Sequence, residues 1–141
     1  MRFDGKVVLV TGGASGIGLA TCQEFARAGA DVLLTDVDAE RGARAAATLA
    51  AEGTRVQFLA LDVTRLESIN AAMDRVKADR GKLDVLVNAA GWDIIQPFME
   101  NTRAYWEKIV ALNFMGPLDV TRAALPLLFE AGNARIVNVG S

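Results

Sequence analysis

The segment that decides the fold is "KVVLVTGGASGIG", which runs from Lys6 to Gly18. It begins as an apolar run of strand length and continues into an eight-residue loop, Thr11–Gly18, in which four residues are glycine. Apolar residues then recur at intervals of three and four from about Ser15 to Ala28, which is the pattern of a helix. A strand that passes through a glycine-rich loop into a helix is the first half of a βαβ unit.

The glycines of this loop predict an anion site. Where the strand of a βαβ unit ends and its helix begins, free backbone N–H groups and the positive end of the helix dipole favour a phosphate. Gly12, Gly16 and Gly18 leave room for a pyrophosphate close to the backbone. The hydroxyls of Thr11 and Ser15 could donate hydrogen bonds or cap the helix. Because the spacing differs from the G-x-G-x-x-G fingerprint, a turn with only a packing role is the alternative.

The rest of the chain alternates strands with helices. Further strands are expected at Ala30–Asp36, Arg55–Asp62, Leu83–Ala90 and Ala134–Gly140, and further helices at about Ala39–Ala51, Arg65–Asp79 and Thr102–Glu130. We therefore predict an α/β fold, a Rossmann-type doubly wound parallel sheet in a three-layer αβα arrangement, with residues 1–141 in one dinucleotide-binding domain. The last predicted strand is apolar and no later segment could cover it. We therefore expect the chain to be the five-stranded N-terminal part of a larger single domain.

The composition excludes several classes of partner. Apolar residues make up 52% of the 141 residues and charged residues 23%, with a net charge of −2, so neither a nucleic-acid footprint nor a basic membrane surface is expected. The chain has no histidine and a single cysteine, Cys22, so we expect neither a transition-metal site nor an internal disulfide. The polar start "MRFDGK" and the lack of a membrane-spanning apolar run favour a cytoplasmic protein.

Acidic residues at the ends of the second and third strands suggest a dinucleotide. Asp36 follows Gly18 by eighteen residues, close to the spacing at which such folds place an acid on the adenosine ribose hydroxyls. A carboxylate there would repel a 2′-phosphate, and the loop offers no arginine to hold one, so NAD is favoured over NADP. Asp36 could instead be a turn residue at the strand end or cap the next helix, although Asp38 could cap that helix equally well. Asp62 could accept a hydrogen bond from an adenine amino group and Val63 could pack on the ring, or Asp62 could simply cap a helix.

The long helical stretch carries an amide within its apolar seam. Its inward positions are predicted to be Trp106, Ile109, Val110, Asn113, Phe114, Pro117, Thr121, Leu125 and Leu128. Because Pro117 has no N–H, the carbonyl of Asn113 loses its helical hydrogen bond and could hold a water, often with a kink. Such a water could serve a proton relay. The alternative is an asparagine that only bonds to a neighbouring strand.

Together these residues resemble the classical short-chain dehydrogenase/reductase family, in order along the whole chain. The loop around Gly12, Ser15, Gly16, Ile17 and Gly18 matches the family's TGxxxGxG cofactor motif. Asp36 matches its NAD-selecting acid, and "LDV", with Asp62 and Val63, matches its adenine contact. "NAAG", with Asn88, Ala90 and Gly91, is similar to the NNAG motif. Asn113 matches the asparagine of the catalytic helix, and "RIVNVGS" matches the strand that ends at the catalytic serine, Ser141.

The resemblance implies an NAD-dependent oxidoreductase that interconverts a secondary alcohol and a ketone. Ser141 would orient the substrate oxygen, and the carbonyl of Asn113 would hold a relay water. The family's Tyr-x-x-x-Lys pair would lie beyond residue 141, and Tyr105 cannot replace it because Ile109 stands four residues later. The 141-residue chain is therefore expected to be inactive alone. Ala89 replaces the second asparagine of NNAG, which predicts lower local stability.

The segment "GWDIIQPF", Gly91–Phe98, predicts an apolar and aromatic lip at the substrate pocket, unless these residues simply pack under the long helix. It resembles the corresponding stretch of dehydrogenases that act on 2-hydroxycyclohexanecarboxyl-CoA, a ring alcohol carried on a CoA thioester. The family also implies a homotetramer through the long helix, for which Leu112, Met115 and Leu127 would face outward. The alternatives to a dehydrogenase are a non-catalytic nucleotide-binding module, complete as given, and a sugar-nucleotide epimerase, which the glycine spacing fits less well.

Overall fold

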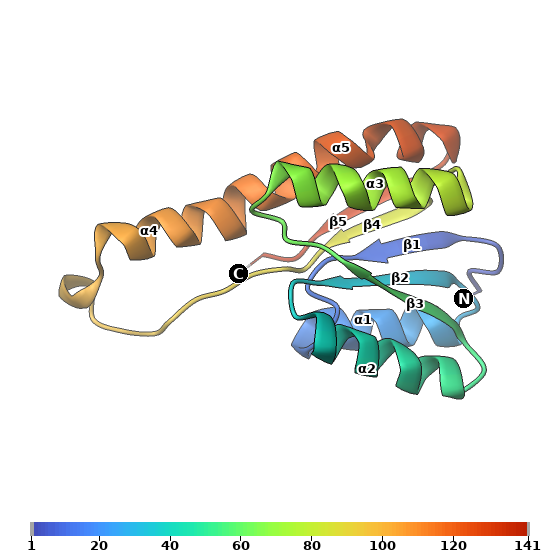
Figure 1. The fold of residues 1–141 in the computed structure, drawn as a ribbon, viewed down its shortest axis with the longest axis horizontal. Coiled ribbons are helices and arrows are strands. Elements are labelled where there is room, and N and C mark those ends of the chain that lie inside the picture. The colour runs from blue at the N-terminus through green and yellow to red at the C-terminus, as the bar shows by residue number, and fades with distance from the viewer. Residues whose placement is uncertain (1, 141) are drawn as a thin grey trace.

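A computed structural model describes residues 2–140 and contains one parallel sheet among them (Figure 1). The five strands run in the order β3-β2-β1-β4-β5, so that β1 lies at the centre. Their bounds are β1 Val7–Val10, β2 Asp31–Asp36, β3 Arg55–Ala60, β4 Val85–Asn88 and β5 Arg135–Asn138. Each lies within a predicted strand, and the predicted α/β Rossmann-type fold is confirmed.

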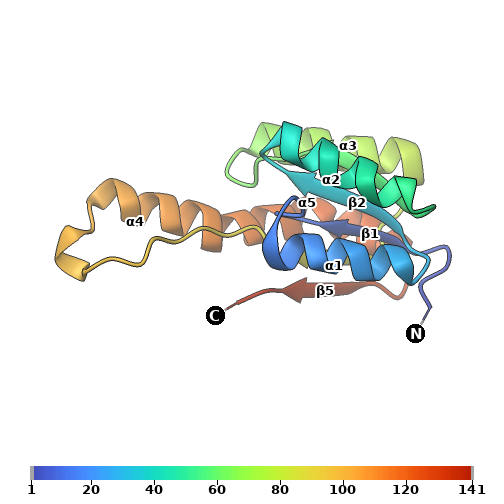
Figure 2. The same cartoon turned by 90° about the horizontal axis from the view of Figure 1, so that it is seen from below.

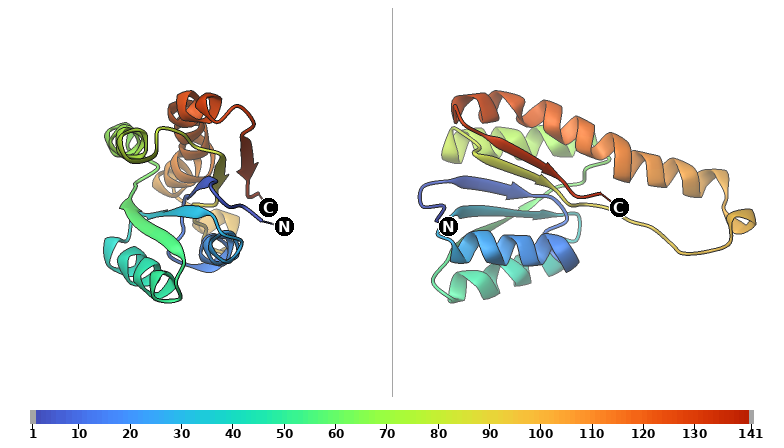
Figure 3. Two further views of the ribbon diagram at one scale, coloured as in Figure 1. Left: turned by 90° about the vertical axis from the view of Figure 1, so that its right-hand side faces the viewer. Right: turned by 180° about the vertical axis from the view of Figure 1, so that it is seen from behind.

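The helices cover the sheet in two layers. Those of the first half are α1 Gly16–Arg27, α2 Ala39–Ala51 and α3 Leu66–Arg80, and those of the second half are α4 Arg103–Val110 and α5 Gly116–Glu130. Figures 1 and 3 show α1 and α2 on one face of the sheet and α3 and α5 on the other. A 3₁₀ turn, Phe98–Glu100, precedes α4 and was not predicted.

The strands bury side chains on both faces because successive residues point to opposite sides of a sheet. In β1, Val7 and Leu9 belong to the apolar cluster under α3 and α5, whereas Val8 and Val10 belong to the cluster under α1 and α2. The single cysteine, Cys22, lies fully buried in the second cluster, and burial raises the pKa of its thiol to about 12. Cys22 is therefore a packing residue.

Strand β5 is the uncovered edge of the sheet. All four of its residues are exposed, including Ile136 and Val137. Figure 2 shows β5 at the border of the molecule, with no strand on its outer side. The apolar edge that the sequence predicted is therefore present.

The long helical stretch departs from its prediction. It is divided by a π-helix, Ala111–Met115, next to Pro117, and its first part projects beyond the end of the sheet (Figure 1). Because no sheet lies beneath that part, the predicted inward residues Trp106, Val110, Asn113 and Phe114 are in fact exposed. Only α5 packs on the sheet, through Gly116, Val120, Ala124, Leu127 and Leu128. Leu127, predicted to face outward, is thus buried. Across residues 2–140, no helix is long and apolar enough to cross a membrane.

Candidate functional site

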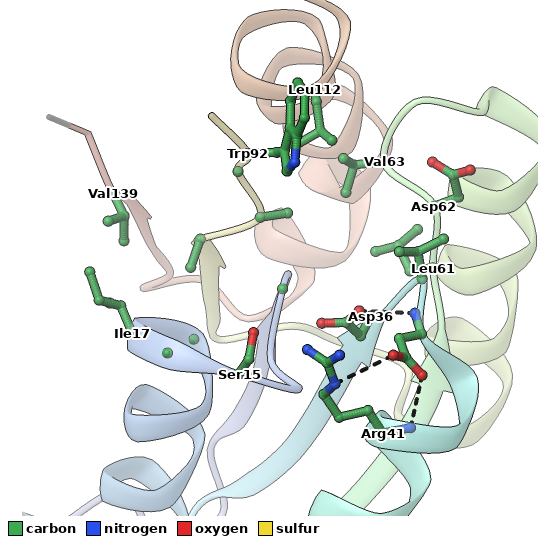
Figure 4. Close-up of a pocket in the computed structure, with 18 of the residues that line it drawn as sticks. Ser15, Ile17, Asp36, Arg41, Leu61, Asp62, Val63, Trp92, Leu112 and Val139 are labelled. Carbon is green, nitrogen blue, oxygen red and sulfur yellow. Dashed lines mark hydrogen bonds and ion pairs between the residues drawn. The ribbon is translucent and has the colours of Figure 1, made fainter. Parts of the chain in front are cut away.

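A cavity of roughly 610 Å³ opens at the carboxyl ends of the strands (Figure 4). The elements that border it are the glycine loop, the ends of β2 and β3, the loop after β4 and the start of the long helix. Of the predicted cofactor residues, those that line it are Gly12, Ser15, Gly16, Ile17, Gly18, Asp36, Asp62, Val63, Ala90 and Gly91. Open parallel sheets bind ligands at this edge, where the strand order reverses on either side of β1.

The glycine loop needs glycine for its conformation and for close packing. Gly12 and Gly16 have positive φ angles of 65° and 51°, a region that other residues rarely adopt. A Cβ on Gly12 would approach Cα of Ala90 to 2.8 Å, and a Cβ on Gly18 would collide with the carbonyl of Gly12. By contrast, a Cβ on Gly16 would meet no atom within 4 Å. Packing thus accounts for Gly12 and Gly18, whereas Gly16 borders open space in the cavity.

The two hydroxyl residues of the loop have different roles. Thr11 is buried, and its Oγ1 accepts hydrogen bonds from the N–H groups of Ala89 and Ala90, each at 3.0 Å. It therefore ties the loop to the end of β4 and does not face a ligand, contrary to one of the predicted roles. Ser15 is exposed at the N-cap of α1 and makes no side-chain cap bond. Ser15 and the first residues of α1 line the cavity together, an arrangement whose hydroxyl and free N–H groups are suited to an anion.

Asp36 is held in place by backbone N–H groups. The N–H of Ala14 donates to Oδ2 at 3.0 Å, and the N–H of Asp38 donates to Oδ1 at 2.9 Å. The cap of α2 is Asp38, whose Oδ1 accepts the N–H of Arg41 at 2.9 Å. Asp36 is therefore not the cap, and each of its oxygens retains acceptor capacity toward the cavity.

Asp62 and Val63 form the wall beyond Asp36. Oδ1 of Asp62 accepts hydrogen bonds from the N–H and the hydroxyl of Thr64, at 2.9 and 2.6 Å, which shapes the turn after β3. The N-cap position of α3 is Arg65, so the alternative in which Asp62 caps that helix is wrong. Val63 is buried against Gly116 of α5, where a Cβ would approach Cγ2 of Val63 to 2.9 Å.

Asn88 is the predicted cofactor residue that the structure does not bring to the cavity. Its side chain is buried, and Nδ2 donates to Oγ1 of Thr121 at 3.1 Å and to Oδ1 of Asn138 at 2.8 Å. Because Asn88 and Asn138 are register partners, this bond joins β4 to β5 behind the cavity, and the Thr121 bond adds α5. Asn88 thus supports the site without facing it.

Asn113 lies in the π-helix and bonds to the loop after β4, not to a strand. Its Oδ1 accepts the N–H of Trp92 at 2.9 Å, and its Nδ2 donates to the carbonyl of Trp92 at 2.9 Å. Ser141 lies outside the described residues. Val139, two residues before it, lines the cavity, so β5 leads toward the same end as Trp92 (Figure 4).

An aromatic group borders this end of the cavity. The ammonium of Lys108 lies 3.6 Å from the ring centroid of Trp92. The ring centroids of Tyr105 and Trp92 are 5.8 Å apart. The hydroxyl of Tyr105 donates to Oδ1 of Asp93 at 2.6 Å, and this bond raises the pKa of Tyr105. A phenol with a raised pKa stays protonated at neutral pH and does not supply a tyrosinate base, which agrees with the exclusion of Tyr105 as the catalytic tyrosine.

The segment predicted to form a lip at the substrate pocket, Gly91–Phe98, contains both packed and exposed side chains. Trp92 is half-buried, but Ile95 and Phe98 are exposed, with Phe98 stacked on Trp106 at 5.7 Å. Trp92 and Phe98 therefore contact the long helical stretch, as the alternative expected in part, whereas Ile95 is fully exposed and Trp92 also lines the cavity. Among the described residues, no group of three or more His, Cys, Asp or Glu side chains could hold a metal ion.

Sequence reasoning missed three charged residues at the cavity: Asp38, which it considered only as a helix cap, Arg41 and Lys108. Arg41 stands in the first turn of α2, the helix that follows the strand ending at Asp36. The closeness of the two residues in the sequence was a signal that could have identified Arg41. Lys108 stands on the projecting helix, whose placement the helical periodicity does not reveal.

Comparisons with known proteins agree on one family. A sequence model described as "short chain dehydrogenase" matches residues 6–141. Cyclopentanol dehydrogenase of Comamonas testosteroni is 39% identical over 140 residues, which cover 99% of this chain and 56% of that protein. D-threitol dehydrogenase of Mycolicibacterium smegmatis is 39% identical over 140 residues, covering 99% of this chain and 54% of that protein.

A solved structure agrees as well. The crystal structure of a gluconate 5-dehydrogenase from Burkholderia cenocepacia, in complex with NADP and tartrate, matches with a TM-score of 0.91 at 31% identity. The match covers 99% of this chain and 55% of that one. The chain thus spans about half the length of the relatives it matches.

Proposed function

Since this chain belongs to the short-chain dehydrogenase/reductase family, we propose that it forms the dinucleotide-binding part of an NAD-dependent oxidoreductase that interconverts a secondary alcohol and a ketone. The observation that carries this proposal is that Asp36 and the open N-terminus of α1 line one cavity. The helix start offers N–H groups to a diphosphate, and the carboxylate offers acceptors to ribose hydroxyls.

The proposed binding mode places the cofactor along the cavity. The diphosphate would lie against Ser15, Gly16 and Ile17, and the adenosine ribose against Asp36. Adenine would lie against Asp62 and Val63, as the order of these residues around the cavity favours. The nicotinamide end would lie near Ala90, Gly91 and Val139. When bound, NAD supplies the hydride acceptor at C4 of its nicotinamide.

We assign catalytic roles to Ser141 and Asn113. The Ser141 hydroxyl would hold the substrate oxygen by a hydrogen bond, and the carbonyl of Asn113 would hold a water of the proton relay. The side chain of Asn113 meanwhile fixes the backbone of Trp92 beside the cavity. Proton removal from the alcohol would fall to the family's tyrosine, with a lysine beside it to lower its pKa.

NAD is proposed as the preferred cofactor because the half-buried carboxylate of Asp36 would repel a 2′-phosphate. The gluconate 5-dehydrogenase neighbour is bound to NADP, so this preference has to be measured for the present chain.

The proposed substrates are secondary alcohols of rings and polyols, since the relatives named above act on cyclopentanol and D-threitol. The aromatic group around Trp92 favours a ring alcohol, either free or carried on a CoA thioester. We further propose a homotetramer, because the long helix exposes Phe114, Met115, Leu118 and Phe129.

The deciding experiment measures NADH formation from cyclopentanol and from threitol by the whole protein, with Ser141→Ala as the comparison. We expect Ser141→Ala to lower kcat by roughly a hundredfold or more. The chain of residues 1–141 should bind NAD but show no turnover, because its sequence holds no Tyr-x-x-x-Lys pair. Full activity of Ser141→Ala would remove Ser141 from its role. Failure of both the whole protein and the chain of residues 1–141 to bind NAD would overturn the proposal.

A further inference from the structure

A charged pair without an assigned role lies at the ribose end of the cavity. Arg41, in the first turn of α2, lines the cavity together with Asp36 and Asp38. Figure 4 draws the side chains of Arg41, Asp36 and Ser15 among the residues that line the cavity. Nε of Arg41 lies 3.4 Å from Oδ2 of Asp38, in a pair exposed to solvent. This end of the cavity thus holds one cation and two carboxylates.

Asp38 performs two tasks with two different oxygens. Oδ1 accepts the backbone N–H of Arg41 at 2.9 Å and caps α2, whereas Oδ2 faces the Arg41 side chain. Asparagine is as good an N-cap as aspartate, because its side-chain oxygen accepts the same bond. The substitution Asp38→Asn therefore removes the charge beside Arg41 and keeps the start of the helix.

We propose that Arg41 is a second determinant of cofactor choice, controlled by Asp38. While Arg41 is paired with Asp38, only the Asp36 carboxylate binds the ribose, through the two ribose hydroxyls. Released from Asp38, Arg41 binds a phosphate on the 2′-oxygen of the ribose. This inference rests on the proposed function, because it concerns the adenosine end of the same cofactor site.

The energetics of the two possible partners favour such a switch. An exposed ion pair is weak, so the Asp38–Arg41 pair holds the guanidinium only loosely. A phosphate can accept two parallel hydrogen bonds from a guanidinium and is the stronger partner. The two acids therefore oppose a 2′-phosphate by different routes: Asp36 repels it directly, and Asp38 competes with it for Arg41.

The test measures binding of 5′-AMP and of adenosine 2′,5′-bisphosphate by calorimetry. These ligands differ only in the 2′-phosphate and need neither nicotinamide nor turnover. We expect Asp38→Asn to tighten the bisphosphate about three- to tenfold, while 5′-AMP changes less than about twofold. Arg41→Ala should weaken the bisphosphate about tenfold, and in the double variant the gain from Asp38→Asn should disappear. Thermal melts followed by circular dichroism check that each variant is folded.

Glu40→Gln is the matched control. Glu40 lies next to the same cap and pairs with Arg44 at 3.3 Å, but neither residue lines the cavity. It removes one negative charge from the same end of α2 and should leave the ratio of the two affinities unchanged. An equal gain with Glu40→Gln, or a gain that persists without Arg41, would overturn the inference. If 5′-AMP binds and Asp38→Asn changes nothing, the inference alone fails. If no variant binds 5′-AMP, the proposed cofactor site fails and this inference fails with it.

Discussion

The side-chain amide of Asn113 brackets the backbone of Trp92, accepting its N–H and donating to its carbonyl, each at 2.9 Å. Asn113 belongs to the π-helix, and Trp92 lies in the loop after β4, so the two bonds fix the projecting helix to the border of the cavity. A Cβ on Gly91 would come within 3.2 Å of Oδ1 of Asn113, so a larger residue there would crowd this approach. The short π-helix at this point agrees with the tendency of such segments to occur at functional sites.

Replacing Asn113 with alanine should free the Trp92 segment. Two net hydrogen bonds of about 1 kcal/mol each would be lost, so exchange of the Trp92 amide hydrogen should become about tenfold faster or more. Hydrogen exchange followed by NMR measures this rate directly. Asn70→Ala, on the exposed side of α3, is the control and should leave it unchanged. An unchanged rate in Asn113→Ala would mean that the loop is held by other contacts.

Asp36→Asn should reduce the preference for NAD over NADP. In the wild type, the N–H groups of Ala14 and Asp38 bond to different oxygens of Asp36, and asparagine keeps only one of these acceptors. Asparagine also carries no charge that would repel a 2′-phosphate. We expect the ratio of the two affinities to fall roughly tenfold or more, because hydrogen bonds to a charged acceptor are the stronger ones. Calorimetric titration with each dinucleotide measures the ratio. Asp74→Asn, an exposed acid on α3, is the control, and an equal ratio in both variants would remove Asp36 from this role.

Local patterns predicted much of the site. The strand, the glycine loop and the helix start are adjacent in sequence, so the rules that place them need no tertiary information. Asp36 could likewise be placed, because a strand end in a parallel sheet always lies at the same edge. Ten of the eleven predicted cofactor residues line the cavity, the exception being Asn88, and two of the ten, Ala90 and Gly91, were predicted from the family resemblance and not from these rules.

The remaining features depend on packing that periodicity does not encode. The spacing of Trp106, Val110 and Phe114 shows that they share a helical face, but not whether a sheet lies under that face. The helix passes the end of the sheet, and these residues are therefore exposed. Asn88 fits its motif but turns away because Thr121 and Asn138 offer it partners behind the cavity. Both differences follow from the positions of elements distant in sequence.

At the opposite end of the sheet, Asp84 is a buried carboxylate held by three donors. The N–H of Val7 donates to Oδ2 at 3.0 Å, and the ammonium groups of Lys6 and Lys82 each lie at 2.9 Å. Burial alone would raise the pKa of Asp84, but these donors together outweigh it and lower the pKa below its ordinary value. A depressed folded-state pKa stabilises the fold above the unfolded pKa of about 3.9, and this contribution is lost as pH falls through the folded pKa.

Asp84→Asn should therefore destabilise the fold in a pH-dependent way. At neutral pH we expect a loss of about 1–3 kcal/mol in the free energy of unfolding, since the donors lose a charged acceptor. The difference from the wild type should shrink as pH falls below about 4, because the carboxyl of the unfolded chain is protonated first, and it should vanish once the pH falls through the lowered folded-state pKa. Urea unfolding at a series of pH values measures it. Glu107→Gln breaks the exposed pair with Arg103 and should change stability by less than about 0.5 kcal/mol. A pH-independent difference for Asp84→Asn would show that its charge is not what stabilises the fold.

Two alanine substitutions in the glycine loop should separate packing from ligand binding. A Cβ on Gly18 would collide with the carbonyl of Gly12, so Gly18→Ala should lower the free energy of unfolding by about 1–3 kcal/mol. Gly16→Ala meets no atom within 4 Å, and its positive φ of 51° should cost only about 1 kcal/mol. Gly53→Ala, with a φ of 82° in an open turn far from the cavity, reproduces that strain without touching the site. If a diphosphate lies against the loop, Gly16→Ala should weaken NAD binding at least tenfold, because its new methyl group occupies the space of the ligand, whereas Gly53→Ala should bind NAD normally. Equal NAD affinity in these two variants, measured by calorimetry beside their urea unfolding curves, would place the diphosphate away from Gly16.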